Sequence, residues 1–112
     1  MTDAAAVARA YFEAIAARDA DVITALFAPD AELVTMAGTV RGADAIAAFY
    51  RENAFAYDDL KPEPGPFVID GNRVAVEIRL RMNGRVSLVA DLFTIEGDRI
   101  RRLGVFLGPN VD

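Results

Sequence analysis

Residues 73–100, RVAVEIRLRMNGRVSLVADLFTIEGDRI, decide the fold expected of this 112-residue chain. The Asn83–Gly84 pair is a strong hairpin signal, and Glu96–Asp98 contains a second turn. Apolar residues alternate with mostly charged ones before the first turn, a period of two that is typical of a strand with one buried face. Those apolar positions are Val74, Val76, Ile78, Leu80 and Met82. The stretch therefore predicts consecutive antiparallel strands.

Helical patterns come before these strands. Apolar residues at helical spacing indicate a first helix over about residues 3–18, and a second helix stops before Pro29. Residues 31–36 form a short strand, and a third helix follows Gly42. This order predicts an α+β domain in which about three N-terminal helices pack over one face of a curved antiparallel sheet. The length suits a single domain that spans residues 1–112.

The composition excludes several classes of function. A net charge of −5 and a pI near 4.6 disfavour binding to nucleic acid or to an anionic membrane surface. The absence of cysteine and histidine removes thiolate nucleophiles, histidine bases and the commonest metal ligands, so neither a metal nor another cofactor is expected. No signal peptide and no bilayer-length apolar run is present, so a cytoplasmic protein is expected.

Asp91 is the one charged residue in VSLVADLFTI, residues 86–95, which otherwise has the composition of a buried strand. Both faces of that strand are largely apolar, so helices should cover one face and a second subunit the other. A homodimer through the outer sheet face is therefore expected. A buried, protonated carboxyl can donate a hydrogen bond to a ligand oxygen. Alternatively, Asp91 is structural and either caps a backbone group or pairs with an arginine such as Arg79.

Three phrases carry a resemblance to a known family: ARAYFEAIAARDADVITALFAPDAEL, GTVRGADAIAAFYR and VADLFTIEGDRI. Together they resemble the SnoaL-like branch of the nuclear transport factor 2 superfamily and, within it, the bacterial steroid Δ5-3-ketosteroid isomerases. The likeness covers essentially the whole chain. It implies a cystatin-like cone, in which three helices close over a curved antiparallel sheet and leave a deep apolar pocket.

The functional residues of these isomerases correspond unevenly to this sequence. Tyr11 and Asp91 match the tyrosine and the protonated aspartic acid of the oxyanion hole, and Tyr50 matches a pocket tyrosine. Phe27 stands where the family has a tyrosine that hydrogen-bonds the catalytic one. Thr35 stands at the position of the general base, and a threonine hydroxyl is no base near neutral pH.

Strand parity predicts an apolar pocket lining that suits a steroid, terpenoid or polyketide-sized ligand. With Thr35 and Tyr50 added from the resemblance, the expected substrate-binding residues are Phe27, Thr35, Tyr50, Val76, Ile78, Leu80, Phe93, Leu103, Val105 and Leu107. One hypothesis is an isomerase-like or cyclase-like enzyme that uses Tyr11 and Asp91 as catalytic residues on a carbonyl substrate. A second is a binding protein for an apolar small molecule, without turnover. A third is a dimerisation module of the same fold.

Overall fold

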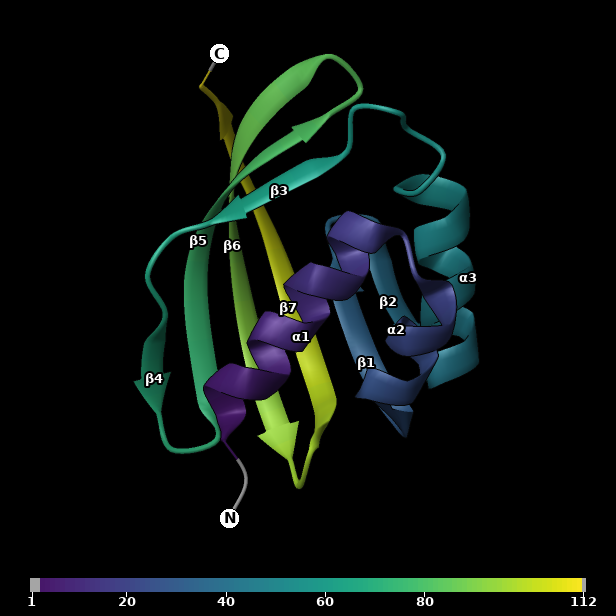
Figure 1. Ribbon diagram of the computed structural model, residues 1–112, viewed down its shortest axis with the longest axis vertical. Coiled ribbons are helices and arrows are strands. Elements are labelled where there is room, and N and C mark those ends of the chain that lie inside the picture. The colour runs from purple at the N-terminus through teal and green to yellow at the C-terminus, as the bar shows by residue number, and fades with distance from the viewer. Residues whose placement is uncertain (1–2, 112) are drawn as a thin grey trace.

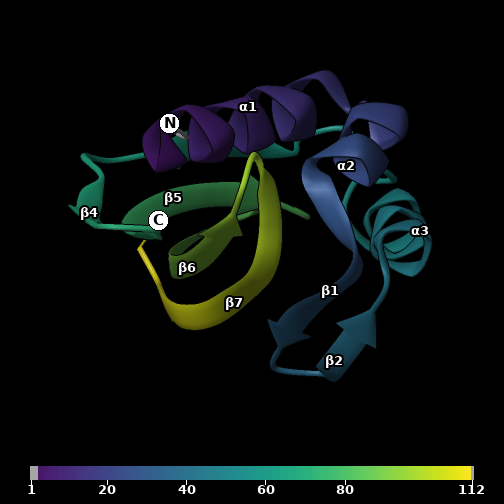
Figure 2. The same cartoon turned by 90° about the horizontal axis from the view of Figure 1, so that it is seen from below.

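The computed structural model describes residues 3–111 and shows three helices over one face of a curved sheet. In chain order the elements are α1 (Ala4–Ala17), α2 (Ala20–Leu26), β1 (Phe27–Thr35), β2 (Gly38–Arg41), α3 (Ala43–Asn53), β3 (Lys61–Pro64), β4 (Val68–Asp70), β5 (Arg73–Met82), β6 (Arg85–Glu96) and β7 (Arg99–Asn110). Helix α1 crosses the hollow side of β5, β6 and β7, while α2 and α3 stand beside β1 and β2 (Figures 1 and 2). The expected α+β cone is confirmed.

Local capping fixes where the first two helices begin and end. The Asp3 carboxylate accepts a hydrogen bond from the first turn of α1, and Asp19 does the same for α2. Arg18 ends α1 in the left-handed conformation, with φ of 54°. Its guanidinium donates to the backbone carbonyls of Tyr57 and Asp58, at 2.7 and 3.0 Å, and so ties the helix end to the loop after α3.

The sheet differs in one pairing from the fully antiparallel arrangement. Its strand order is β2-β1-β7-β6-β5-β3, with β4 also paired to β5. Strands β5, β6 and β7 form the expected antiparallel meander, but β1 pairs with β7 in parallel, so the sheet is mixed. β7, the final strand of this meander, lies between β1 and β6. That position brings the two halves of the sequence into one sheet.

The hairpin turn between β5 and β6 forms where the sequence predicts it. Asn83 and Gly84 have φ of 56° and 76°, the left-handed values that an Asn-Gly turn supplies. The Asp59 carboxylate accepts hydrogen bonds from both of their backbone N–H groups, at 2.9 and 2.8 Å. These hydrogen bonds hold the pKa of Asp59 below its usual value and anchor the loop that carries Leu60.

Strand parity separates the two faces of the sheet. Asp91 lies between Val76 of β5 and Val105 of β7 on the face under the helices. The outer face carries the partly exposed side chains of Leu88, Leu92 and Phe106, and no helix of residues 3–111 packs on it (Figure 2). Within the same residues, no helix has the length and apolar character needed to cross a membrane.

Candidate functional site

A cavity of about 330 Å³ lies between the helices and the curved sheet. This volume is at the lower end of the range typical of small-molecule sites. Its lining consists of Tyr11, Phe12, Ile15, Leu33, Thr35, Met36, Ala37, Phe49, Tyr50, Asn53, Ala54, Leu60, Pro62, Ile78, Leu80, Met82, Val89, Asp91, Val105 and Leu107. The walls are almost entirely carbon. Asp91 is the one charged residue among them, and no lysine or arginine within residues 3–111 belongs to the lining.

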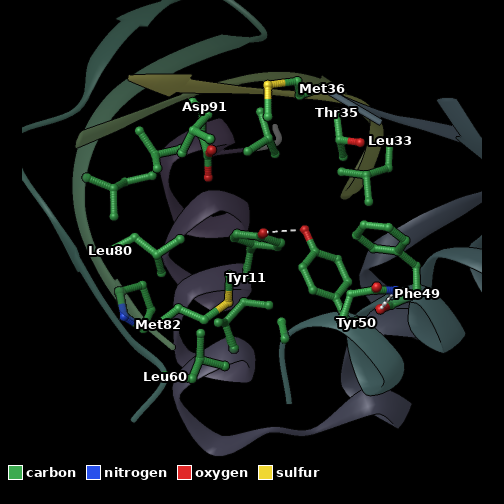
Figure 3. Close-up of a pocket in the computed structure, with 18 of the residues that line it drawn as sticks. Tyr11, Leu33, Thr35, Met36, Phe49, Tyr50, Leu60, Leu80, Met82 and Asp91 are labelled. Atoms are coloured by element: carbon green, nitrogen blue, oxygen red, sulfur yellow. Dashed lines mark hydrogen bonds between the residues drawn. The ribbon is translucent and has the colours of Figure 1, made fainter. Parts of the chain in front are cut away.

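Two tyrosines from different helices meet in this cavity. The Tyr11 hydroxyl, on α1, lies 2.5 Å from the Tyr50 hydroxyl, on α3, and both side chains are buried (Figure 3). Burial is the main cause that raises the pKa of each hydroxyl well above 10, so both stay neutral. In the isomerases that the chain resembles, a tyrosine at the position of Phe27 hydrogen-bonds the first tyrosine. Here Tyr50 makes that hydrogen bond to Tyr11 instead.

The carboxyl of Asp91 is buried without a partner among residues 3–111. It is 4% exposed, and no side chain or backbone group of residues 3–111 makes a hydrogen bond or an ion pair with it. Burial raises its pKa from 3.8 to about 7. Arg79 cannot pair with this carboxyl, because it lies opposite Leu88 in the β5–β6 ladder and its side chain is on the outer face of the sheet. The expectation of a capping or arginine-paired Asp91 is wrong.

The carboxyl of Asp91 points into the same space as the tyrosine pair (Figure 3). After burial, its negative charge is a further cause of the raised pKa of both Tyr11 and Tyr50. Because α1, α3 and β6 each supply one of them, the site depends on the complete fold rather than on a local motif. The arrangement can present hydrogen-bond donors to one oxygen of a ligand.

Thr35 lines the cavity but its hydroxyl is engaged locally. It donates to the Gly38 carbonyl at 3.2 Å and accepts from the Ala37 N–H at 3.1 Å, within the β1–β2 turn. Glu32 lies on the other side of β1, where its carboxylate pairs with Arg41. Asp91 is therefore the one carboxylate that the described residues contribute to the cavity lining.

The cavity lining and the sequence-predicted site residues overlap in part. Besides Tyr11 and Asp91, the cavity is lined by Thr35, Tyr50, Ile78, Leu80, Val105 and Leu107. The placement of the other four is wrong, since Phe27, Val76, Phe93 and Leu103 are buried in the packed core and do not line the cavity. Phe27 and Phe93 pack edge-on against Tyr11, with ring centroids 6.2 and 5.3 Å away, and fill the space below it.

Several lining residues were not predicted. Leu33 and Val89 share the strand parity of Thr35 and Asp91, so the alternation that found the others could have found them. Phe49 and Asn53 lie on the same face of α3 as Tyr50. Leu60 and Pro62 lie at the start of an irregular, proline-rich segment. No alternation of apolar and polar residues there indicates which side chains face the cavity.

The comparisons with known proteins agree with this architecture. The SnoaL-like domain family matches residues 8–103. A candidate polyketide cyclase from Sinorhizobium meliloti has 28% identity, covering 88% of this chain and 92% of its own, with a TM-score of 0.78. A candidate ketosteroid isomerase from Kribbella flavida has 19% identity, covering 96% and 78%, with a TM-score of 0.83. A protein with a cystatin-like fold from Methylobium petroleophilum has 21% identity, covering 97% and 78%, with a TM-score of 0.84. No curated protein shows significant similarity.

Proposed function

This chain belongs to the SnoaL-like domain family, and we propose from that premise that it binds an apolar molecule by one oxygen and performs acid–base chemistry on it. The ligand is a steroid, terpenoid or polyketide-like compound with a carbonyl or phenolic oxygen. One observation carries the proposal: the buried Asp91 carboxyl has no partner among residues 3–111 and opens into the cavity beside the Tyr11 hydroxyl.

Two donors converge on the ligand oxygen in this proposal. At neutral pH both protonation states of Asp91 are populated, because its pKa is about 7. The protonated carboxyl donates one hydrogen bond. The Tyr11–Tyr50 pair holds two hydroxyl protons, of which only one lies between the oxygens, so the other can be donated to the ligand. Both bonds strengthen as charge develops on an enolate oxygen.

Proton transfer in the proposed reaction falls to Asp91 itself. No second carboxylate of the part of the chain that the structure describes lines the cavity, and the Thr35 hydroxyl is engaged in a turn. A ketosteroid isomerase resemblance implies a separate base at the position of Thr35, whereas the cyclases of this family are understood to use one aspartate as both acid and base. Cyclase-like chemistry is thus the better match. The similarity to the candidate polyketide cyclase from Sinorhizobium meliloti supports it.

Binding of a phenol tests the oxyanion site. We expect 2-naphthol to bind the parent protein and to bind Asp91→Asn and Tyr11→Phe at least about tenfold more weakly. The first variant replaces the acid O–H by a weaker amide N–H donor, and the second removes a hydroxyl donor. Fluorescence titration measures the affinity. Asp70→Asn and Tyr57→Phe are matched controls, because neither residue lines the cavity. If the two site variants bind 2-naphthol as the parent does, the proposal is wrong.

A binding protein without turnover is the alternative. The engaged Thr35 hydroxyl favours it, because a cavity with one carboxylate has no separate group to move a proton between carbons. We expect Thr35→Asp to gain Δ5-3-ketosteroid isomerase activity if the rest of the site has catalytic geometry. A folded Thr35→Asp variant with no measurable activity would show that the cavity is shaped for other chemistry.

We also propose that a second copy of the chain covers the outer sheet face. Leu88, Leu92 and Phe106 lie there on adjacent strands, and the side chain of Phe106 is 52% exposed. Glu77 and Arg79 lie beside them on β5 with opposite charges. A two-fold axis brings a patch against itself, so neighbouring charges of opposite sign can pair across it.

A further inference from the structure

We infer that the cavity also binds a lipophilic tertiary amine in its protonated form, held by the carboxylate of Asp91. The inference goes beyond the proposed function, which uses the neutral carboxyl as a donor to oxygen. Here the same group acts as the counter-ion of a cation. The ligand is a tertiary ammonium whose substituents are hydrocarbon, and nothing in the oxygen-binding proposal requires it.

The charge distribution of the cavity carries the inference. Among residues 3–111, Asp91 is the only charged residue in the lining, and no lysine or arginine accompanies it. The ion pairs among residues 3–111 lie at the surface, where Arg9, Arg41 and Arg101 pair with other carboxylates. When Asp91 loses its proton, no cation of the described chain neutralises it. A net charge of −5 makes the surroundings still more favourable to a cation.

None of the groups of the described chain that face Asp91 is a cation, so a ligand has to neutralise its carboxylate. Val76 of β5 and Val105 of β7 flank it in the sheet, and both are apolar. The titratable groups that interact with it are Tyr11 of α1 and Tyr50 of α3, and both remain neutral because burial raises their pKa. The pKa of Asp91 is raised by burial alone, to about 7, so the carboxylate is populated at and above neutral pH.

The number of donors selects a tertiary amine. A tertiary ammonium has one N–H, which one carboxylate oxygen can accept, whereas a primary ammonium has three and would leave donors unpaired against carbon. The carboxylate is already desolvated in the folded protein, so pairing adds only the desolvation of the ligand. Aromatic rings of Phe12 and Phe49 also line the cavity, and aromatic faces attract ammonium ions.

The experiment compares two ligands of the same shape. N,N-dimethylbenzylamine is a cation, and isobutylbenzene places a carbon where the amine has its nitrogen. We expect the parent protein at about pH 8 to bind the amine at least about tenfold more tightly than the hydrocarbon, by calorimetry. Below about pH 7 the affinity for the amine should fall by about tenfold per pH unit, while that for the hydrocarbon stays constant.

Variants separate this inference from the proposed function. Asp91→Asn should lose the preference for the amine and keep its affinity for isobutylbenzene, which also shows that the variant is folded; Asp70→Asn should behave as the parent. Tyr11→Phe should lower the affinity for 2-naphthol but not the affinity for the amine. An amine that binds no better than isobutylbenzene, or equally well to Asp91→Asn, overturns the inference. If the parent fails to bind 2-naphthol, or if Asp91→Asn and Tyr11→Phe bind it as the parent does, only the proposed function is overturned.

Discussion

Asp91 couples the stability of the whole protein to pH. Its pKa is about 7 in the folded state against 3.8 when exposed, so the folded protein holds a proton that the unfolded chain releases between these values. The stability therefore falls as the pH rises from about 4 through 7, and the full cost remains above 7. A difference of about three in pKa corresponds to a loss of at most about 4 kcal/mol in the free energy of unfolding.

Replacement of Asp91 by asparagine removes this titration. We expect Asp91→Asn to be more stable than the parent at about pH 8 by up to about 4 kcal/mol, and similar to it at about pH 4. Urea unfolding at several pH values measures the difference. Asp70→Asn, which alters an exposed aspartate, should follow the parent at every pH. An Asp91→Asn variant that runs parallel to the parent across this range would contradict the raised pKa.

The two tyrosine hydroxyls should act as a unit. Tyr11→Phe and Tyr50→Phe each remove one partner of a buried hydrogen bond and leave the other unpaired, whereas the double variant leaves no unpaired hydroxyl. We expect the double variant to be less destabilised than the sum of the single variants, by about 1 kcal/mol. Denaturant unfolding of all four proteins gives the coupling. Additive effects would mean that the hydroxyls do not depend on each other.

Asp91 could be predicted as a candidate from the sequence alone, because an aspartate inside an apolar strand is costly wherever it lies. Tyr11 and Tyr50 needed the family resemblance, since a tyrosine on an apolar helix face is usually core. Their mutual hydrogen bond could not be predicted, because it depends on how α1 and α3 approach each other. Whether Phe93 lines the cavity or fills the core is decided by neighbours from other elements.

Among the elements, the β5–β6 hairpin depends on the backbone conformation of Gly84. Alanine at its φ of 76° is strained by about 1–2 kcal/mol. We expect Gly84→Ala to lower the free energy of unfolding by that amount, measured by thermal or urea denaturation. Asparagine tolerates the left-handed region, so Gly84→Asn should retain more of the stability than Gly84→Ala does. Equal losses in both variants would show that the conformation of this turn is not limiting.

Local periodicity predicted the strands well and their irregularities poorly. The alternation in β5 is a property of neighbouring residues, and Val74, Val76 and Ile78 are buried as expected. The same alternation in residues 99–107 places Ile100 and Leu103 on opposite faces, yet both are fully buried. A register shift between Thr94 and Ile95 lies at this end of the β6–β7 ladder. Such bulges depend on the curvature of the whole sheet, and a short stretch of sequence does not contain that information.

At the scale of the molecule, the outer sheet face should control the oligomeric state. We expect Phe106→Glu to convert a dimer to a monomer, because two copies of the patch would place like charges against each other. Size-exclusion chromatography with light scattering measures the mass. Ile69→Glu is the matched control, since Ile69 is equally exposed but lies on an edge strand, opposite Val74. A parent protein that is monomeric at high concentration would refute the proposed dimer.

The position of β7 has a consequence for how the chain matures. Leu33 in β1 pairs with Leu103 in β7, and β7 in turn joins β1 to β6. On the ribosome, α1, α2, β1 and α3 are all synthesised long before residues 99–110 emerge. Until then their apolar faces have no completed sheet to pack on, and contacts this distant in sequence form slowly. The nascent protein should therefore remain a client of chaperones until its last strand leaves the exit tunnel.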